Sequence, residues 1–288
     1  MEKFKYKKEP LSRHQLALFI IRMVLLKYIP LCIIAVVMIF PFLWLLSLAL
    51  REGGNLAQIT LIPDGITFRN FSRAWEYANI GVSFKNSTIL ATLAISGNLL
   101  LGALAAYPLA RYRFRGKNIV FIIILSSMMI PFQLTMIPLS DIIANMRLNN
   151  TLIGVALPGL VSAVGVFLLR QAYMIIPKDL ENAARIDGAS ELRIWWQIMM
   201  PQIKPAMATL AIFVFVASWG DLLWPLIVLQ DETKYTLPVN IAYLTGMFGN
   251  ELQTLSAACV ITILPVIILF LFLQRYFIEG LSVGSVKG

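Results

Sequence analysis

Six long apolar runs constrain this chain more than any other feature of its sequence. A helix needs about 20 mostly apolar residues to cross the hydrocarbon core of a bilayer. Six segments meet that requirement, at about residues 29–50, 86–110, 119–140, 152–174, 205–229 and 257–277. Hydrophobic residues make up 59% of the chain and charged residues 14%, against about 45–50% and about 25% in soluble domains. The sequence therefore predicts an all-α membrane protein with six transmembrane helices.

The third run is the least regular of the six, because Pro131 and Pro138 lie inside it. Proline removes a backbone donor and kinks a helix. In a bilayer the carbonyl groups freed in this way must face protein or water. This span is therefore expected to line a path or to pack deep in the bundle.

The segments between the runs predict how the chain is oriented. Lys and Arg mark the cytoplasmic side of a membrane protein, and here they are concentrated in the N-terminus, in "RYRFRGKN", between the fourth and fifth runs, and in the tail. Both termini are therefore predicted to be cytoplasmic, and 51–85 is expected to lie outside as short helices on the bundle. No cleavable signal peptide is expected, since the first run is span-length and lacks an A-x-A-like end. The predicted parts are a basic N-terminus (1–28), a six-span domain (29–277), a loop (175–204) within it, and a tail (278–288).

Composition and motifs exclude several kinds of function. The net charge of +9 does not predict nucleic-acid binding, because the basic residues flank apolar runs as the positive-inside rule requires. Cys32 and Cys259 are too few for a zinc or disulfide framework, and His14 is the only histidine. No phosphate-binding G-x-x-x-x-G-K-[ST] loop is present. The chain is therefore predicted not to be an enzyme and to hold no metal or other cofactor.

One charged stretch interrupts the apolar runs. Residues 181–202 read "ENAARIDGASELRIWWQIMMPQ". Pro177 suits the first turn of a helix, and Gly188 suits its end because glycine adopts the left-handed conformation. Ser190 can then begin a second helix that Pro201 stops. The pattern predicts helix, turn and helix, lying parallel to the membrane.

Small residues on an exposed helix let another protein approach closely. Ala183 and Ala184 are such residues. The neighbouring acids and Arg185 would orient a partner through their charges. The alternative is an amphipathic helix that holds the loop to the bilayer surface. Composition alone leaves both interpretations open.

The stretch resembles the EAA signature of ABC importer permeases, E-A-A-x-x-x-G followed by I-x-L-P. Here it stands as "NAARIDG" and "IMMP", and the longer "AARIDGAS" resembles the carbohydrate-uptake branch, the maltose- and glycerol-phosphate-type permeases. "AAYPLARYRFRGKN", "SWGDLLWPLIVL" and "FLQRYFIEGLSVGSVKG" agree with that branch. In that family the signature loop is the coupling helix, which docks in a cleft on a cytoplasmic ATPase subunit. The resemblance implies an ABC type I importer permease fold, with this helix between spans 4 and 5.

The resemblance also implies which residues couple the chain to the ATPase. They are Glu181, Asn182, Ala183, Ala184, Arg185, Asp187, Gly188, Ala189 and Pro201. The chain departs from the family at Asn182, where the signature has Glu. Glu181 is adjacent, but one residue along a helix turns a side chain by about 100°, so whether it replaces that Glu stays open. In maltose-type permeases the tail reaches the ATPase interface, which implies a contact by Gly284, Ser285, Lys287 and Gly288. The alternative for the tail is a frayed terminus.

The implied assembly is a binding-protein-dependent sugar importer in a bacterial or archaeal cell (inner) membrane. Its other members would be a second homologous permease, an ATPase dimer that binds ATP and Mg, and an external solute-binding protein that delivers the sugar. The alternative is a stand-alone ion-coupled secondary transporter, which needs intramembrane charges and usually shows inverted repeats. Only one acid lies in a span and no repeat is visible.

That acid is Asp221, in "SWGDLLWPL". One hypothesis is that Asp221, Trp219 and Trp224 line the translocation path. The favoured alternative is that Asp221 caps helix ends broken around Gly220 and Pro225, or pairs across a subunit interface.

Overall fold

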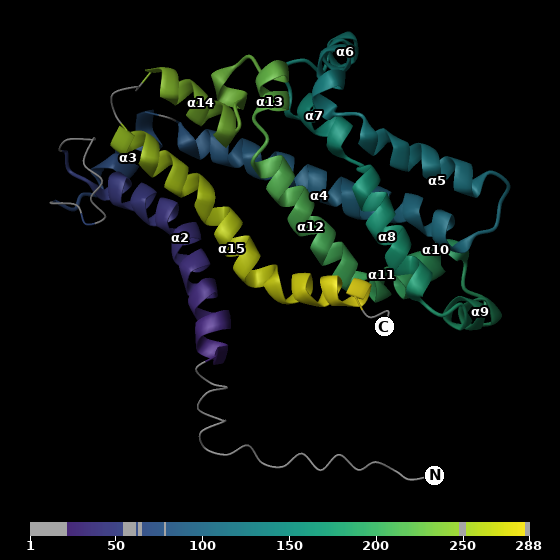
Figure 1. The fold of residues 1–288 in the computed structure, drawn as a ribbon. Helices are drawn as coiled ribbons and strands as arrows, with labels where there is room; N and C mark the ends of the chain where they lie inside the picture. Colours follow the sequence, from purple (N-terminus) through teal and green to yellow (C-terminus); the bar gives the residue numbers. More distant parts are fainter. Residues whose placement is uncertain (1–21, 54–61, 63–64, 78, 248–251, 286–288) are drawn as a thin grey trace, which may run out of the picture.

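A computed structural model describes residues 22–53, 62, 65–77, 79–247 and 252–285 (Figure 1). Its α-helices are α2 (Ile29–Leu50), α3 (Arg69–Tyr77), α4 (Ile80–Arg111), α5 (Lys117–Ser126), α6 (Phe132–Asn145), α7 (Leu152–Ala156), α8 (Ala163–Ile175), α9 (Asp179–Ile186), α10 (Glu191–Arg193), α11 (Met200–Gln202), α12 (Lys204–Trp219), α13 (Leu223–Val228), α14 (Leu237–Met247) and α15 (Leu252–Ser285). Short π- or 3-10 turns lie at Val24–Tyr28, Ser127–Met129, Leu157–Gly159, Ile194–Met199 and Glu232–Lys234. Within the described ranges the only β-pairing is one bridge, Arg51 with Ile66. The all-α prediction is confirmed.

The helices account for six membrane spans only if three of the spans are bent. Val24–Leu50, Ile80–Arg111 and Leu252–Phe272 are each long and apolar enough to cross a bilayer. The other three are pairs of helices bent by 102° (Lys117–Met129 with Phe132–Asn145), 46° (Leu152–Gly159 with Ala163–Ile175) and 78° (Glu191–Gln202 with Lys204–Trp219). The bends at 130–131 and 160–162 lie inside the predicted third and fourth spans, whereas the 78° bend lies just before the predicted fifth span, which is itself interrupted between Trp219 and Leu223.

The sharpest bend follows from one proline. Ile130, just before Pro131, is extended with φ −89° and ψ 114°, as expected for a residue that precedes proline. Pro138 lies inside α6 without ending it. The kink predicted in the third span is present, and Pro131 causes it.

α4 is the central helix, and it packs against α8, α12, α7 and α14. Close approach depends on small residues on its surface. At Gly97 an added Cβ would lie 2.7 Å from the carbonyl oxygen of Leu160. A residue with a side chain would therefore clash with the backbone at this position. Buried Ala103 and Ala106 allow the same close packing near the C-terminal end of α4. That end of the helix contacts α9.

The break in the fourth span is held by a buried amide from α4. Asn98 donates to the Gly159 carbonyl at 2.8 Å and accepts from the Ser162 N–H at 2.9 Å and its hydroxyl at 2.6 Å. These bonds satisfy backbone groups that the interrupted helix leaves without partners. The bent geometry is therefore built into the sequence of the neighbouring helix.

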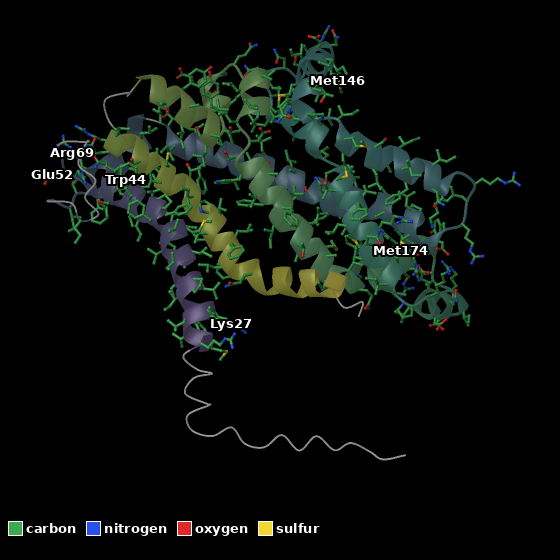
Figure 2. The ribbon with its side chains drawn as sticks, viewed as in Figure 1. Lys27, Trp44, Glu52, Arg69, Met146 and Met174 are labelled. Carbon is green, nitrogen blue, oxygen red and sulfur yellow. The ribbon has the colours of Figure 1, made fainter. Side chains whose placement is uncertain are left out.

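α2 stands at the edge of the bundle. It packs against α15 and α3, while most of its side chains are exposed (Figures 1 and 2). In Figure 2, Lys27 lies in the π-turn just before α2, and Glu52 lies just beyond its end. α3 lies in the 51–85 segment and packs on α15 and α4, as expected of a short helix covering the bundle.

Candidate functional site

The helix–turn–helix predicted for the charged stretch is present, with α9 as its first helix. α9 begins after Pro177 and carries Asp179 and Glu181 in its first turn, where acids oppose the positive end of the helix dipole. It ends in a Schellman motif: the Gly188 N–H donates to Arg185 at 3.1 Å and the Ala189 N–H donates to Ala184 at 3.0 Å. Gly188 has φ +79°, the left-handed conformation that this motif requires.

The second helix ends close to the predicted place. Ser190 caps its start, accepting from the Arg193 N–H at 3.4 Å. The chain then continues through a π-helical turn, Ile194–Met199, into α11. Pro201 is the second residue of α11, and the helix ends one residue later at Gln202, so the predicted stop is correct to within one residue. The direction changes after Gln202, by the 78° bend into α12.

The inner face of α9 is tied to α4 by a buried ion pair. Arg111, the last residue of α4, donates through Nε to Glu181 Oε1 and Oε2 at 2.9 and 3.0 Å, and its Nη2 lies 2.9 Å from Oε2. The Tyr107 hydroxyl donates to Oε1 at 2.9 Å. The side chains of Arg111 and Glu181 are 4% and 5% exposed. The resemblance implied Glu181 among the coupling residues and left open whether it replaces the signature Glu; in the structure it faces the bundle, where Tyr107 and Arg111 of α4 donate to it.

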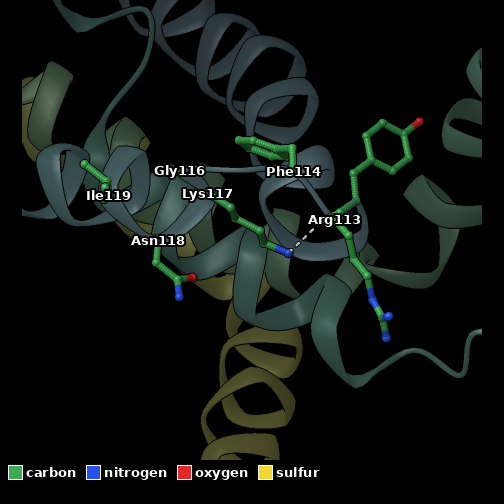
Figure 3. A pocket seen from close by; sticks show the side chains of 7 residues that line it. Arg113, Phe114, Gly116, Lys117, Asn118 and Ile119 are labelled. Atoms are coloured by element: carbon green, nitrogen blue, oxygen red, sulfur yellow. Dashed lines mark hydrogen bonds between the residues drawn. The ribbon is translucent and has the colours of Figure 1, made fainter.

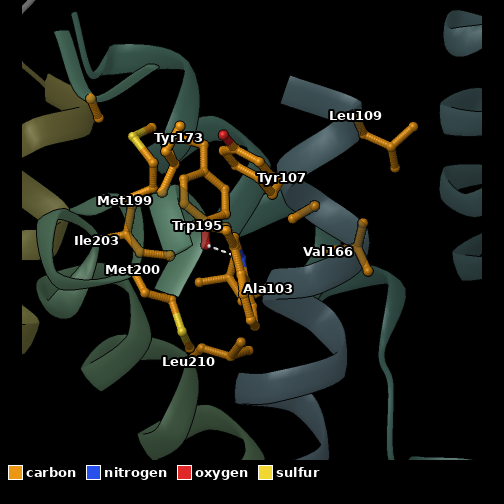
Figure 4. Close-up of a cluster of buried hydrophobic side chains, with 14 residues drawn as sticks. Ala103, Tyr107, Leu109, Val166, Tyr173, Trp195, Met199, Met200, Ile203 and Leu210 are labelled. Atoms are coloured by element: carbon orange, nitrogen blue, oxygen red, sulfur yellow. Dashed lines mark hydrogen bonds between the residues drawn. The ribbon is translucent and has the colours of Figure 1, made fainter. Parts of the chain in front are cut away.

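Ala184 also faces inward. It is 6% exposed and belongs to a cluster that joins α9 and the helix after it to α4, α8 and α12 (Figure 4). Inside that cluster the Trp195 indole N–H donates to the Tyr173 hydroxyl at 3.1 Å. The prediction of two exposed alanines is therefore wrong for Ala184, whose small size serves packing. The cluster comprises Ala103, Ala106, Tyr107, Leu109, Val166, Leu169, Tyr173, Ala184, Ile194, Trp195, Met199, Met200, Ile203 and Leu210.

The outer face of α9 is bare. Asn182, Ala183, Arg185, Asp187 and Gly188 are exposed. Ile186 is 87% exposed, unusual for a large apolar side chain at the end of a charged helix. Ala189 is half-buried. α9 thus has one anchored face and one free face that combines small, apolar and polar groups.

Arg185 is engaged within the turn. It donates to Glu191 at 2.6 and 3.1 Å, and the Tyr112 hydroxyl donates to the same carboxylate at 3.0 Å. The hydrogen bonds from Arg185 hold the pKa of Glu191 below its ordinary value. Partial burial and the bond to Glu191 raise the pKa of Tyr112. This surface network links α9, α10 and the end of α4.

The loop after α4 lies next to this network. Lys117 donates to the carbonyls of Ala110 and Tyr112 at 3.1 and 2.9 Å, and so caps the last turn of α4 (Figure 3). A hollow of about 450 Å³ lies over residues 112–119, with Arg113 at its rim. The basic loop is thereby fixed to the helix that carries Arg111.

A second candidate region is a cavity of about 620 Å³ deeper in the bundle. Asp221 and Trp224 line it, together with Asn98, Ser162 and residues flanking the breaks of the bent spans. Asp221 Oδ1 accepts from the Trp224 N–H at 3.4 Å, and so it also caps the start of α13. The Trp224 indole donates to the Val155 carbonyl at 3.0 Å.

Trp219 does not share this cavity. Its indole donates to the Thr262 carbonyl of α15 at 3.0 Å, and its ring stacks on Phe215 and meets Phe84 edge-on. Trp219 therefore packs toward α15, and the hypothesis that it lines the path with Asp221 is corrected.

The predicted tail contact is only partly described. Gly284 and Ser285 are in the last turn of α15, while Lys287 and Gly288 lie outside the described residues.

Sequence reasoning missed Arg111 and Tyr107 as part of this site. The available signal was an arginine as the last residue of a long apolar helix, one turn after a tyrosine. An arginine at the end of a membrane helix can equally well anchor the helix at the membrane–water interface. The sequence therefore does not show that Arg111 pairs with Glu181.

Residues 98–283 match the family described as "Binding-protein-dependent transport system inner membrane component". The arabinooligosaccharides transport system permease protein AraQ of Halalkalibacterium halodurans is 40% identical over 260 residues, which cover 88% of this chain and 93% of that protein. The melibiose/raffinose/stachyose import permease protein MelC of Bacillus subtilis is 37% identical over 269 residues, 89% of this chain and 94% of that protein. A chain in the solved structure of a bacterial ABC transporter involved in the import of the acidic polysaccharide alginate aligns with TM-score 0.78 at 26% identity, over 94% of this chain and 100% of that one.

Proposed function

Because the chain belongs to the family of binding-protein-dependent transport system inner membrane components, as a permease of a carbohydrate ABC importer, we propose that the outer face of α9 docks a cytoplasmic ATPase. The observation that carries this proposal is the asymmetry of α9. Its inner face is fixed by Glu181 and Ala184, whereas Ala183 and Ile186 are exposed at its tip. A helix anchored on one side and bare on the other can receive a push from a partner and pass it inward.

The ATPase subunits would bind ATP with its Mg ion, and this chain would supply none of that chemistry. Closure of the ATPase dimer would move α9, and α9 would move the spans between an outward-open and an inward-open path. A second, homologous permease would complete that path. An external binding protein would deliver the sugar. The exposed side chains of α2 leave room for a partner subunit or for lipid at that edge.

The substrate we propose is a neutral oligosaccharide. The cavity of about 620 Å³ is lined by apolar groups with Asn98, Ser162, Ser218 and Asp221, and its lining includes no Lys or Arg. Because Asn98 and Ser162 already bond to each other and to the break, Ser218 and Asp221 are the lining residues that would bind sugar hydroxyl groups, and the wall offers no cation to a phosphate or uronate. The sugars in the names of AraQ and MelC are of this neutral kind.

The proposed setting is the bacterial or archaeal cell (inner) membrane, with both termini cytoplasmic. α9 and the basic 112–119 loop then lie on the same cytoplasmic side, as the concentration of Arg and Lys there requires.

The tail residues Gly284, Ser285, Lys287 and Gly288 are proposed as a second ATPase contact, because α15 continues as a helix as far as Ser285.

A mild-detergent pull-down of the chain from its native membranes tests this proposal. Recovery of an ATPase together with a second permease is the expected result. Recovery of the chain alone, from an extract in which other ABC assemblies survive, would overturn it.

A further inference from the structure

We propose that Arg111 is the positioning residue that couples α9 to the membrane spans. The inference rests on the proposed docking of an ATPase on the outer face of α9. The Arg111 guanidinium binds Glu181 of α9 through Nε and Nη2, at 2.9–3.0 Å. Its Nη1 donates to the carbonyls of Ile176 and Tyr173 at the end of α8, at 2.8 and 3.3 Å. One planar cation therefore joins α4, α8 and α9.

The pair is built for stiffness. Both side chains are almost fully buried, so water does not compete for their bonds. The Arg111 Nε–H is shared between both carboxylate oxygens, and the guanidinium is also held from the other side by the Ile176 carbonyl, so its position is fixed from two directions. Tyr107, one turn earlier on α4, donates to the same carboxylate at 2.9 Å. A displacement of α9 is thus transferred to α4 and α8 with little slack.

α4 carries that displacement to the cavity. It is one continuous helix from Ile80 to Arg111, and from Arg111 to Asn98 it extends about 20 Å at 1.5 Å per residue. Asn98 holds the break between Gly159 and Ser162, and both of those residues line the cavity. A movement that begins at Glu181 therefore reaches the cavity wall through two sets of short, buried bonds on a single helix.

Arg170 offers a matched control at the same end of the bundle. Its Nε donates to the Leu109 carbonyl at 3.0 Å, and its guanidinium lies 4.0 Å from the centre of the Phe121 ring. These contacts fasten α8 to α4 and α5 but do not involve α9. Replacing Arg170 removes a half-buried arginine of similar size and leaves the route from α9 intact.

The experiment uses the complete transporter reconstituted with its binding protein. The ATPase rate is measured with and without sugar-loaded binding protein, and assembly is measured by the ATPase that co-purifies. In Arg111→Gln, the ratio of stimulated to basal rate is expected to fall close to one while the ATPase still co-purifies. Arg111→Lys should keep part of the ratio, because it retains the charge but not the planar group that binds Glu181 and the carbonyls of α8 together. Arg170→Gln should keep at least half of the native ratio.

Two results would overturn the inference: a native ratio in Arg111→Gln, or an equal loss in Arg170→Gln. If Arg111→Gln does not assemble, the double variant Arg111→Gln/Glu181→Gln removes the unpaired buried charge and is expected to assemble with a ratio still close to one. Loss of assembly in that variant too would assign the pair to folding alone and would also overturn the inference. Failure of the proposed docking is distinct, since a photoreactive residue at position 186 of the otherwise native complex would then give no ATPase adduct.

Discussion

Replacing Gly188 with valine tests whether the turn after α9 must keep its left-handed geometry. Gly188 has φ +79°, and a Cβ built there meets nothing within 4 Å, so the effect of the side chain is conformational. The left-handed region costs an L-residue about 1–2 kcal/mol, and β-branching restricts it further. At about 1.4 kcal/mol per factor of ten, a cost of about 2 kcal/mol reduces the population of the native turn roughly 30-fold relative to its alternatives.

The assay is sugar uptake, normalised to the amount of chain in the membrane. Gly188→Val should lose at least about tenfold in uptake at an unchanged membrane level, because the Schellman bonds that orient the end of α9 are lost. Gly188→Asn should retain most of the activity, since asparagine tolerates the left-handed region. Comparing Gly188→Val with Gly188→Asn separates the effect of backbone geometry from the effect of adding a side chain.

Gly116 provides the matched control. It has φ +82° and open space around its Cβ position, but it lies in the loop before α5. Gly116→Val carries the same backbone cost and should leave more than half of the uptake. Native uptake in Gly188→Val, or an equal loss in Gly116→Val, would refute the reasoning.

Three further predictions concern α9, its surface network and the cavity. Ala184→Leu should lower the Tm of the purified complex, because overpacking a tight core costs about 1–3 kcal/mol; Ala183→Leu, on the exposed face, should leave the Tm unchanged but reduce ATPase co-purification. The lowered pKa of Glu191 means that its bond to Arg185 contributes its full stability above the ordinary glutamate pKa and loses it as the pH falls from that value through the lowered pKa. The Tm gap between the native chain and Glu191→Gln should therefore stay constant from pH 7 down to the ordinary glutamate pKa and shrink only at lower pH, and a gap that does not change there would contradict this. Asp221→Asn should change sugar-stimulated ATP hydrolysis less than about threefold, because an amide oxygen can still cap α13; complete loss with intact assembly would assign the acid a role in the path.

Much of the fold could be predicted because hydrophobic length and proline chemistry act locally. The six apolar runs and the kink at Pro131 follow from the sequence alone, and so does the glycine turn at Gly188. The breaks in the other two bent spans were harder to predict. Asn98 fixes the break in the fourth span from another helix, and nothing local reports that contact.

The sequence predicted the helical segment of the candidate site, but not which residues of α9 face the bundle and which face outward. The same short sequence places Ala183 outside and Ala184 inside, and only the packing of α9 on the bundle decides which is which. Likewise, an acid next to the signature position reads as a surface group until Arg111, 70 residues away in sequence, is seen beside it. Trp219 and Trp224 differ in the same way, since the break between α12 and α13 directs them to different neighbours.

Site-specific photo-crosslinking from position 186 tests the central claim most directly. A photoreactive amino acid replaces Ile186, the exposed apolar residue at the tip of α9, in the chain within its native membrane. The same replacement at Phe114, an exposed apolar residue of the neighbouring loop, is the control. The account predicts a strong adduct with an ATPase subunit from position 186 and a much weaker one from position 114. Equal yields at the two positions, or an adduct with lipid alone from position 186, would contradict the docking of an ATPase on α9.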